Sequence, residues 1–331
     1  MAALTETQVS DFRKNGYLVI EDVLATSSLD ALHNEYDAIL NREVPRLLTA
    51  GKIVEGHSGL PFVQRYPLIL AQLQNMYDLY QHLDISLPLL HKMAPDATMN
   101  AGAAVFQQLL RNPTILDIAE SLLGSELFCN PVQHTRIKPP LGAMPKGVVD
   151  SNIDKTNWHQ DEAVLSDDVG DVQMLTVWVA VTDASVENGC MVCVPGSHRR
   201  DMAMHCPGNG FSSAEIFIPD DLIGQDEVVA MPVKKGGVVL LDQQTIHGSL
   251  SNTSNQTRWS FDLRYNVIGQ NTGREVFPGF VARSAANPAS ELTDVGVWAQ
   301  SWFEARDRLA LLDRLEFNDR WKRYSKHQLC A

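Results

Sequence analysis

The stretch RWSFDLRY, residues 258–265, alternates between polar and apolar side chains. Successive side chains of a β-strand point to opposite faces, so the alternation predicts a strand with one face of each kind. The polar face holds Arg258, Ser260, Asp262 and Arg264. The apolar face holds Trp259, Phe261, Leu263 and Tyr265. Because a protein core excludes unpaired charge, we expect the polar face to line a polar cavity.

Short strand-like runs separated by Gly, Pro, Asn and Asp fill the chain from residue 127 onward. Many short strands without intervening helices favour a β-sandwich or closed jelly roll over a parallel α/β sheet. The first third shows apolar residues at helical spacing, and a charged, aromatic helix is expected near the end, so the predicted class is α+β. Strands are expected at 16–20, 127–138, 172–182, 190–195, 228–233, 237–241, 245–250 and 258–268, and helices at 27–41, 68–83 and 112–123.

No internal repeat or flexible linker divides the 331 residues, so a single domain is predicted over 1–331. We expect a mainly helical part at 1–126, a jelly-roll core at 127–268 and a C-terminal extension at 269–331. Residues 139–157 form an insert rich in Pro, Gly, Asn and Asp directly before His159. Long loops of this kind are often active-site lids, which is the role predicted for the insert.

The chain carries 27 Lys and Arg against 40 Asp and Glu, a formal net charge of −13. This balance argues against a nucleic-acid or anionic-membrane partner, because binding to phosphate groups is driven by basic residues. No apolar run is long enough to cross a bilayer, and the start does not resemble a secretory signal. The five cysteines are widely spread, and we predict reduced thiols in a cytoplasmic protein, with Cys190 and Cys193 in a core strand.

Three His-x-Asp/Glu triplets occur, which is little more than random placement would give. Residues two apart share a face in a strand but not in a helix. The triplets at 33–35 and 82–84 lie in predicted helices, so neither pair is expected to chelate a metal. Only His159 and Asp161, in TNWHQDEAVL (156–165), have strand-like surroundings in which both side chains could bind one ion.

A third metal ligand is predicted at His247, in TIHGSLSN (245–252), where Gly248 and Ser249 allow close backbone approach. Two histidines and one carboxylate on one face of an octahedron suit Fe(II) and leave three positions for substrates. Arg258 follows eleven residues later and offers a planar, bidentate fork for a chelating dicarboxylate.

The order His159-x-Asp161, ENGCMVCVPGSH (187–198), His247-Gly-Ser and Arg258 resembles the phytanoyl-CoA dioxygenase family of Fe(II)/2-oxoglutarate oxygenases, as does the opening FRKNGYLVIEDVL (12–24). The resemblance runs from about residue 8 to about 268. It implies a double-stranded β-helix with helical buttressing, iron held by His159, Asp161 and His247, and O₂ as co-substrate. Arg258 would bind the distal carboxylate of 2-oxoglutarate.

Further roles follow from the same resemblance. Trp178 matches a tryptophan beside the co-substrate, and Ser260 is expected on the co-substrate side of the polar face. His134 falls where the family usually has Gln or Met, and it is a candidate 2-oxoglutarate contact. Arg264 is a candidate substrate residue, with an internal pair to Asp262 as the alternative.

The favoured function is hydroxylation of a small-molecule metabolite with release of succinate and CO₂. The same cofactors could instead drive desaturation or ring closure. A third reading is a non-catalytic jelly-roll binding or sensor protein, against which the complete ligand set and Arg258 argue. The sequence leaves the substrate and the oligomeric state open.

Overall fold

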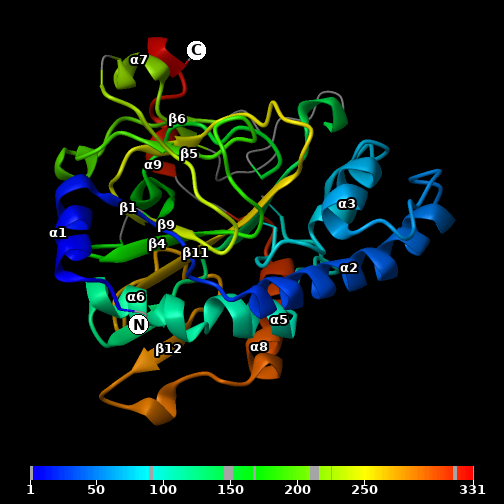
Figure 1. Cartoon of the computed structure of the whole chain (residues 1–331), viewed down its shortest axis with the longest axis horizontal. Helices are drawn as coiled ribbons and strands as arrows, with labels where there is room; N and C mark the ends of the chain where they lie inside the picture. The colour runs from blue at the N-terminus through cyan, green and yellow to red at the C-terminus, as the bar shows by residue number, and fades with distance from the viewer. Residues whose placement is uncertain are drawn as a thin grey trace.

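The computed structural model describes residues 3–88, 92–144, 152–166, 169–208, 216–224, 226–315 and 319–330. Its core is a pair of antiparallel sheets, as Figure 1 shows. The major sheet has the order β1-β9-β4-β11-β2-β12, and β3 pairs with the first half of β11; the minor sheet has the order β10-β5-β8. The predicted α+β jelly roll is confirmed.

The strands are short, as the sequence predicts. Those of the major sheet are β1 (Tyr17–Ile20), β2 (Glu126–Cys129), β3 (His134–Lys138), β4 (Met174–Ala180), β9 (Val238–Asp242), β11 (Arg258–Val267) and β12 (Phe280–Ser284). The minor sheet consists of β5 (Met191–Cys193), β8 (Val229–Met231) and β10 (His247–Ser249), and a separate ribbon pairs β6 (Cys206–Pro207) with β7 (Ile216–Phe217).

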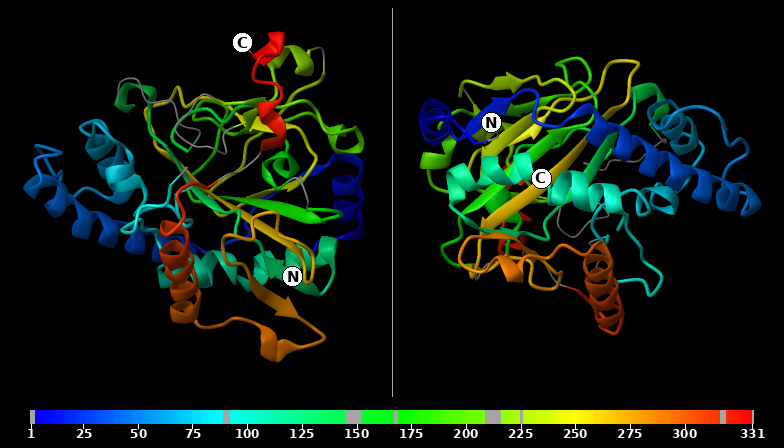
Figure 2. Two further views of the ribbon diagram at one scale, coloured as in Figure 1. Left: turned by 180° about the vertical axis from the view of Figure 1, so that it is seen from behind. Right: turned by 60° about the horizontal axis from the view of Figure 1, so that its bottom comes forward.

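Helices from the first third lie across the outer face of the major sheet, as two views from different directions show (Figures 1 and 2). The α-helices are α1 (Glu6–Asn15), α2 (Thr26–Thr49), α3 (Phe62–Leu70), α4 (Tyr77–Tyr80), α5 (Ala103–Val105), α6 (Pro113–Leu123), α7 (Asp220–Ile223), α8 (Val295–Ala310) and α9 (Asp319–Lys322). A π-helix, η1 (Phe106–Leu110), continues α5. The 3₁₀ turns are η2 (Leu141–Ala143), η3 (Asp161–Val164), η4 (Ser197–Arg199), η5 (Pro288–Ser290) and η6 (Gln328–Cys330).

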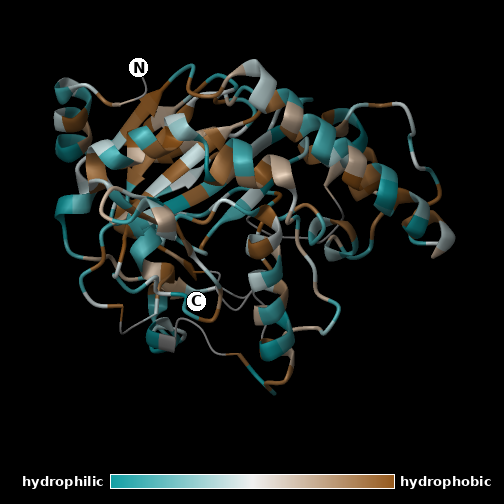
Figure 3. Ribbon diagram, turned by 90° about the horizontal axis from the view of Figure 1, so that it is seen from below, coloured by the Kyte–Doolittle hydropathy of each residue, from teal (hydrophilic) through white to brown (hydrophobic). Residues whose placement is uncertain are grey.

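The apolar face of β11 anchors these helices to the sheet. Trp259 is fully buried, and its ring lies 4.5 Å from that of Tyr36 on α2 and 4.8 Å from that of Phe62 on α3, measured between centroids. Tyr36 is also fully buried and donates a 2.6 Å hydrogen bond to the carbonyl of Leu83. The strands seen from below in Figure 3 are predominantly hydrophobic, in line with this packing.

Three element predictions are wrong in detail. The single charged, aromatic helix expected near the end is divided, because α8 ends at Ala310 and α9 begins at Asp319. The helix expected at 68–83 is interrupted: α3 starts earlier, at Phe62, and ends at Leu70, and Asn75 then accepts a hydrogen bond from the Tyr77 amide at the start of α4. The strand expected at 127–138 is split into β2 and β3, because the Asn130 side chain accepts from the Val132 amide in a turn. Sequence analysis did not predict β12, which pairs with β2 in the major sheet.

The prediction of five reduced cysteines is also wrong. Cys206 and Cys330 form a disulfide across 124 residues of sequence, with Cα atoms 5.3 Å apart. Packing of the C-terminal segment brings them together, and their spacing in the sequence carries no sign of it. Cys129, Cys190 and Cys193 are free and buried, so the CxxC cysteines do lie in and beside a core strand. Within the described residues, no helix combines the length and apolar character that a membrane span requires.

We predict that Trp259→Ala destabilises the fold strongly, because it removes the ring shared by α2, α3 and β11. The free energy of unfolding, measured by urea denaturation, should fall by about 3–5 kcal/mol. Leu311→Ala is the matched control, since Leu311 is 85% exposed and its truncation should change little. A loss below about 1 kcal/mol for Trp259→Ala would contradict this account of the helical buttress.

Candidate metal and co-substrate site

The polar face of β11 points into the space between the two sheets. Arg258, Ser260, Asp262 and Arg264 are all at most 7% exposed. Directly opposite partners on adjacent strands share a face of the sheet. On β3, Lys138 lies opposite Arg258, Arg136 opposite Ser260, and His134 opposite Asp262. On β4, Trp178 lies opposite Asp262, and Thr176 opposite Arg264. The predicted polar cavity is therefore built from three neighbouring strands of one sheet.

The three predicted metal ligands are brought together at one end of this cavity. His247 begins β10, and its backbone exchanges two hydrogen bonds with that of His159, 2.9 and 3.0 Å long. Asp161 is the first residue of η3. The approach requires Gly248, because a Cβ there would lie 2.8 Å from the carbonyl oxygen of Thr156. The backbone approach predicted at Gly248 is thus present.

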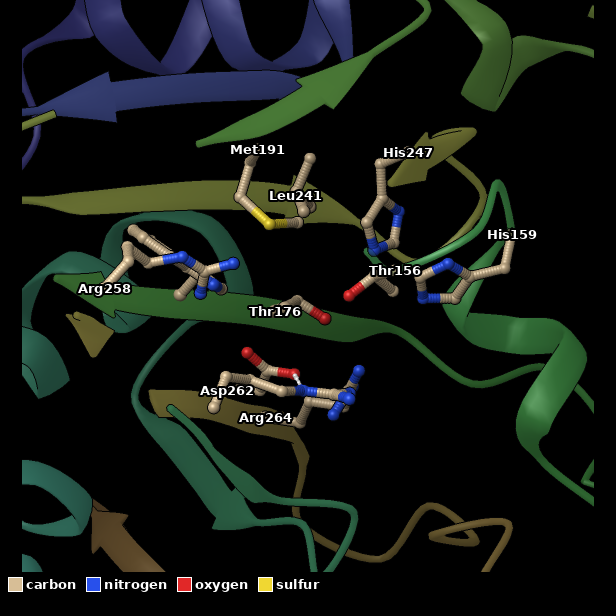
Figure 4. A pocket seen from close by; sticks show the side chains of 11 residues that line it. Thr156, His159, Thr176, Met191, Leu241, His247, Arg258, Asp262 and Arg264 are labelled. Carbon is tan, nitrogen blue, oxygen red and sulfur yellow. Dashed lines mark hydrogen bonds and ion pairs between the residues drawn. The ribbon is translucent and has the colours of Figure 1, made fainter. Parts of the chain in front are cut away.

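The ligand atoms are arranged to share an ion. Nε2 of His159 lies 3.7 Å from Oδ1 of Asp161, and Nε2 of His247 lies 4.0 Å from Oδ2. Each Nδ1 is 2.9 Å from a backbone carbonyl, that of Asn157 or Thr245, and donates to it, which leaves each Nε2 lone pair directed inward. Figure 4 shows the two imidazoles turned toward one another, with Arg258 at the far end of the pocket. Among the described residues, only these three form such a cluster.

Electrostatics keeps His159 and Asp161 in the forms that bind metal. Burial, and then His247, lower the pKa of His159 to about 3, so its imidazole is neutral at physiological pH. Burial alone would raise the pKa of Asp161, but Arg264 and the two histidines hold it well below its usual range. Arg264 donates to Oδ1 at 2.5 Å, and Thr176 donates to Oδ2. The donor set, two imidazoles and one carboxylate, fits Fe(II) with positions to spare.

Arg258 fits a buried anion. Its guanidinium donates to Ser260 at 2.7 Å and lies 5.3 Å from the ring centroid of Trp178, while its Nε is buried without a hydrogen-bond partner. Burial lowers its pKa to about 9. Ser260 and Trp178 therefore hold the arginine from two sides.

The remaining predicted site residues have protein partners. Arg264 pairs with Asp161 and donates to the carbonyl of Val132, so the alternative pairing with Asp262 is wrong. Asp262 instead pairs with Arg136, at 2.8 Å. Nδ1 of His134 lies 3.0 Å from a carboxylate oxygen of Asp84. The substrate role of Arg264 and the co-substrate role of His134 stay predictions.

Comparison with known proteins places this site in a family. Residues 12–260 match the phytanoyl-CoA dioxygenase family. The chain belongs to that family. The predicted class, the Fe(II)/2-oxoglutarate-dependent dioxygenases, is thereby confirmed, with iron and 2-oxoglutarate as its cofactors and oxidoreductase as its enzyme class.

Individual relatives of this dioxygenase span most of its length. The phytanoyl-CoA dioxygenase domain-containing protein 1 of Danio rerio is 28% identical, over 78% of this chain and 88% of its own. An ectoine dioxygenase of Bordetella bronchiseptica is 25% identical, over 80% and 76%. The crystal structure of EctD from S. alaskensis with 2-oxoglutarate and 5-hydroxyectoine shares the fold, with a TM-score of 0.54, 20% identity and 88% and 89% coverage.

The C-terminal segment of the dioxygenase contacts the metal-binding turn, a feature that sequence analysis missed. Trp321 is 4% exposed, and its indole donates a 2.8 Å hydrogen bond to the carbonyl of Ala163 in η3. Its ring lies 4.7 Å from that of His205, whose Nε2 accepts from the amide of Gln160, between two metal ligands. Arg320 donates to the carbonyl of Glu162. No motif in the sequence connects residues 160 and 321.

Arg136 and Lys138 on β3 are further residues of the polar face that sequence analysis missed. The alternation of polar residues in HTRIK, residues 134–138, was a usable sign that Arg136 and Lys138 share the polar face, but the pairing of β3 with β11 was not predictable.

Of the insert predicted to be a lid, 139–157, residues 145–151 lie outside the described part of the chain, so the lid stays a prediction.

We predict that Trp321→Ala loosens the turn that carries Asp161, because it removes both a hydrogen bond and a buried ring. Amide hydrogen exchange at 160–165 should become faster, and anaerobic Fe(II) binding should weaken by about 3- to 30-fold. Lys326→Ala is the control, since Lys326 is an exposed residue of the same C-terminal segment. Unchanged exchange at 160–165 would show that the tail does not support the metal site.

Proposed function

We propose that this dioxygenase hydroxylates a small-molecule metabolite, with Fe(II) held by His159, Asp161 and His247. The observation that carries the proposal is the convergence of one atom from each of these side chains within 4.8 Å, with both histidine Nδ1 atoms committed to backbone carbonyls. When bound, iron and 2-oxoglutarate supply O₂ activation coupled to decarboxylation, which yields succinate and CO₂.

The protein groups then have separate tasks. Arg258 holds the distal carboxylate of 2-oxoglutarate, with Ser260 and Trp178 fixing its guanidinium. Arg264 and Thr176 hold the Asp161 carboxylate ionised and in place. His134 stays a candidate contact on the same face of the sheet.

Three features favour enzymatic oxidation of a small molecule over halide transfer, over a binding or sensor role, and over a macromolecular substrate. The carboxylate at Asp161 is kept, which argues against halide transfer, because that chemistry needs an open position at this ligand. The complete ligand set and the buried arginine argue against a binding or sensor protein. The pocket lies inside the barrel and is lined mostly by polar and charged side chains, with Trp178, Met191 and Leu241 as its apolar members, which suits a small polar molecule better than a macromolecule.

We predict that His247→Ala abolishes Fe(II) retention and succinate release. The loss should leave stability nearly unchanged, because trimming a polar site removes little packed core. Metal content after anaerobic loading and gel filtration, together with succinate formation from 2-oxoglutarate, are the measurements. His57→Ala serves as the control, since its ring pairs with Glu55, outside the proposed metal site. Full activity in His247→Ala would rule out the metal assignment.

We predict that Arg258→Ala weakens 2-oxoglutarate binding without loss of iron. Truncating one member of a buried charge pair costs on the order of 2–5 kcal/mol, or roughly 30-fold to several-thousand-fold in affinity. Arg258→Lys should recover only part of the loss, because an ammonium cannot form the bidentate fork. The test is anaerobic titration of the Fe(II) charge-transfer band; binding within about twofold of wild type would locate the clamp elsewhere.

A further inference from the structure

The disulfide between Cys206 and Cys330 joins the C-terminal segment, residues 319–330, to the ribbon of β6 and β7. Cys206 begins β6, and Cys330 ends η6. The segment lies against β6, as Figure 1 shows for α9. The bond therefore fixes one end of the segment that carries Arg320 and Trp321.

The ribbon side of the bond leads directly to the metal ligands. His205 precedes Cys206, and its Nε2 accepts a 3.1 Å hydrogen bond from the amide of Gln160. The Gln160 side chain accepts in turn from the amide of Ala203, at 2.8 Å. His205 and Gln160 are both fully buried. Because Gln160 stands between two of the proposed ligands, these bonds tie the position of the ligands to residues 203–206.

The C-terminal segment reaches the same turn through separate contacts. Trp321 packs in one apolar cluster with Ala163 of η3 and Ile216 of β7. Its indole donates to the carbonyl of Ala163, and Arg320 donates to that of Glu162. The segment is therefore packed against both the ribbon and the metal-binding turn.

The docked position of the segment depends on these tertiary contacts. Its helix α9 has four residues and its turn η6 has three. Helices shorter than about 12 residues are marginal in water on their own. The disulfide adds an attachment beside the surface on which the segment docks, and this raises the effective concentration of its contacts. Breaking the bond should let the segment detach more often.

The two bonded sulfur atoms differ in accessibility. Cys206 is fully buried, whereas Cys330 is half-buried. A thiolate opens a disulfide by attacking an accessible sulfur, and exposed disulfides are the more readily reduced ones. Cys330 is therefore the cysteine at which a reductant can open the bond.

We propose that the Cys206–Cys330 disulfide is a redox-sensitive clamp on the metal site. The oxidised pair holds the C-terminal segment against η3, and reduction by a dithiol releases the segment and weakens Fe(II) binding. The proposal rests on the proposed function, because it takes Asp161 of η3 as a metal ligand.

The redox step is a thiol–disulfide exchange. One thiolate of the dithiol bonds to Sγ of Cys330, the bond between the two cysteines breaks, and Cys206 leaves as a thiolate that takes up a proton. The second thiolate of the dithiol then displaces Cys330, which also gains a proton. Two electrons pass to the cysteine pair, and the dithiol is oxidised to its own disulfide.

A bond that only staples the ribbon makes a different prediction. Its reduction would lower the overall stability but would leave exchange at 160–165 and Fe(II) affinity unchanged. A clamp couples the bond to the docked segment, and such coupling is reciprocal. Loss of the Trp321 contacts should then make the bond easier to reduce.

The experiment compares oxidised and reduced wild type with Cys330→Ser, and Lys326→Ala is the control from an exposed position of the same segment. Dithiothreitol reduces the protein and is removed by anaerobic gel filtration, so that it cannot chelate iron. Fe(II) titration and amide hydrogen exchange at 160–165 are the measurements, and thermal unfolding checks the fold. Cys129, Cys190 and Cys193 are already free, so only the bonded pair changes its redox state.

We expect reduction to weaken Fe(II) binding by about 3- to 30-fold and to speed exchange at 160–165. Cys330→Ser should match reduced wild type and should not respond to dithiothreitol, while Lys326→Ala should behave as wild type. In metal-free protein, Trp321→Ala should make the disulfide about 3- to 30-fold easier to reduce, a rise of about 14 to 44 mV in its reduction potential. Thiol alkylation in dithiothreitol buffers measures that potential.

Equal Fe(II) affinity and equal exchange in the two redox forms would overturn the proposal. Free Cys206 and Cys330 in wild type purified without reductant would do the same, as would unfolding of the reduced protein or of Cys330→Ser, which would make the bond a staple. If oxidised wild type binds no Fe(II), the proposed function fails instead, and exchange at 160–165 still decides whether the bond controls the turn.

Discussion

The two faces of β11 require different surroundings: one needs apolar packing partners and the other needs partners for buried charge. One face carries Trp259 and Phe261 into the packing with α2 and α3, and the other carries Arg258 and Arg264 into the barrel. Because side chains alternate along a strand, a shift of one residue in register would exchange these environments. The hydrophobic contact between helices and sheet therefore also fixes the position of every charged group in the site. Stability and chemistry depend here on the same alternation.

The interior of the barrel holds more positive than negative charge. Arg136, Lys138, Arg258 and Arg264 face Asp161 and Asp262, and two ion pairs use both carboxylates. Buried pairs recover their desolvation cost only with good geometry and additional hydrogen bonds, which Thr176 supplies for Asp161. The two remaining cations leave the interior with an excess of positive charge. A dianionic co-substrate would correct the balance at one end while iron occupies the other.

Sequence analysis recovered the parts of the site that reside in short, local patterns. The alternation in residues 258–265 was readable because it lies within one strand, and the pair His159 and Asp161 because it lies within one short segment. His247 was found from its own short motif and its order along the chain. Partners distant in the chain were not readable. Arg264 was expected to contact substrate or Asp262, and its partner is Asp161, because the choice depends on how η3 packs against β11. The disulfide likewise depends on tertiary packing, and the break between α3 and α4 on a turn in which the Asn75 side chain accepts from the Tyr77 amide.

Contacts between η3 and the C-terminal segment also set an order for assembly during synthesis. Asp161 leaves the ribosome about 160 residues before Arg320 and Trp321, the residues that bind the carbonyls of its turn. Chains are synthesised at roughly 5–20 residues per second, so the η3 turn is made on the order of ten seconds before Arg320 and Trp321. During that interval the nascent chain holds the ligands without their final support. Metal capture by the finished site would accordingly follow, rather than guide, completion of the chain.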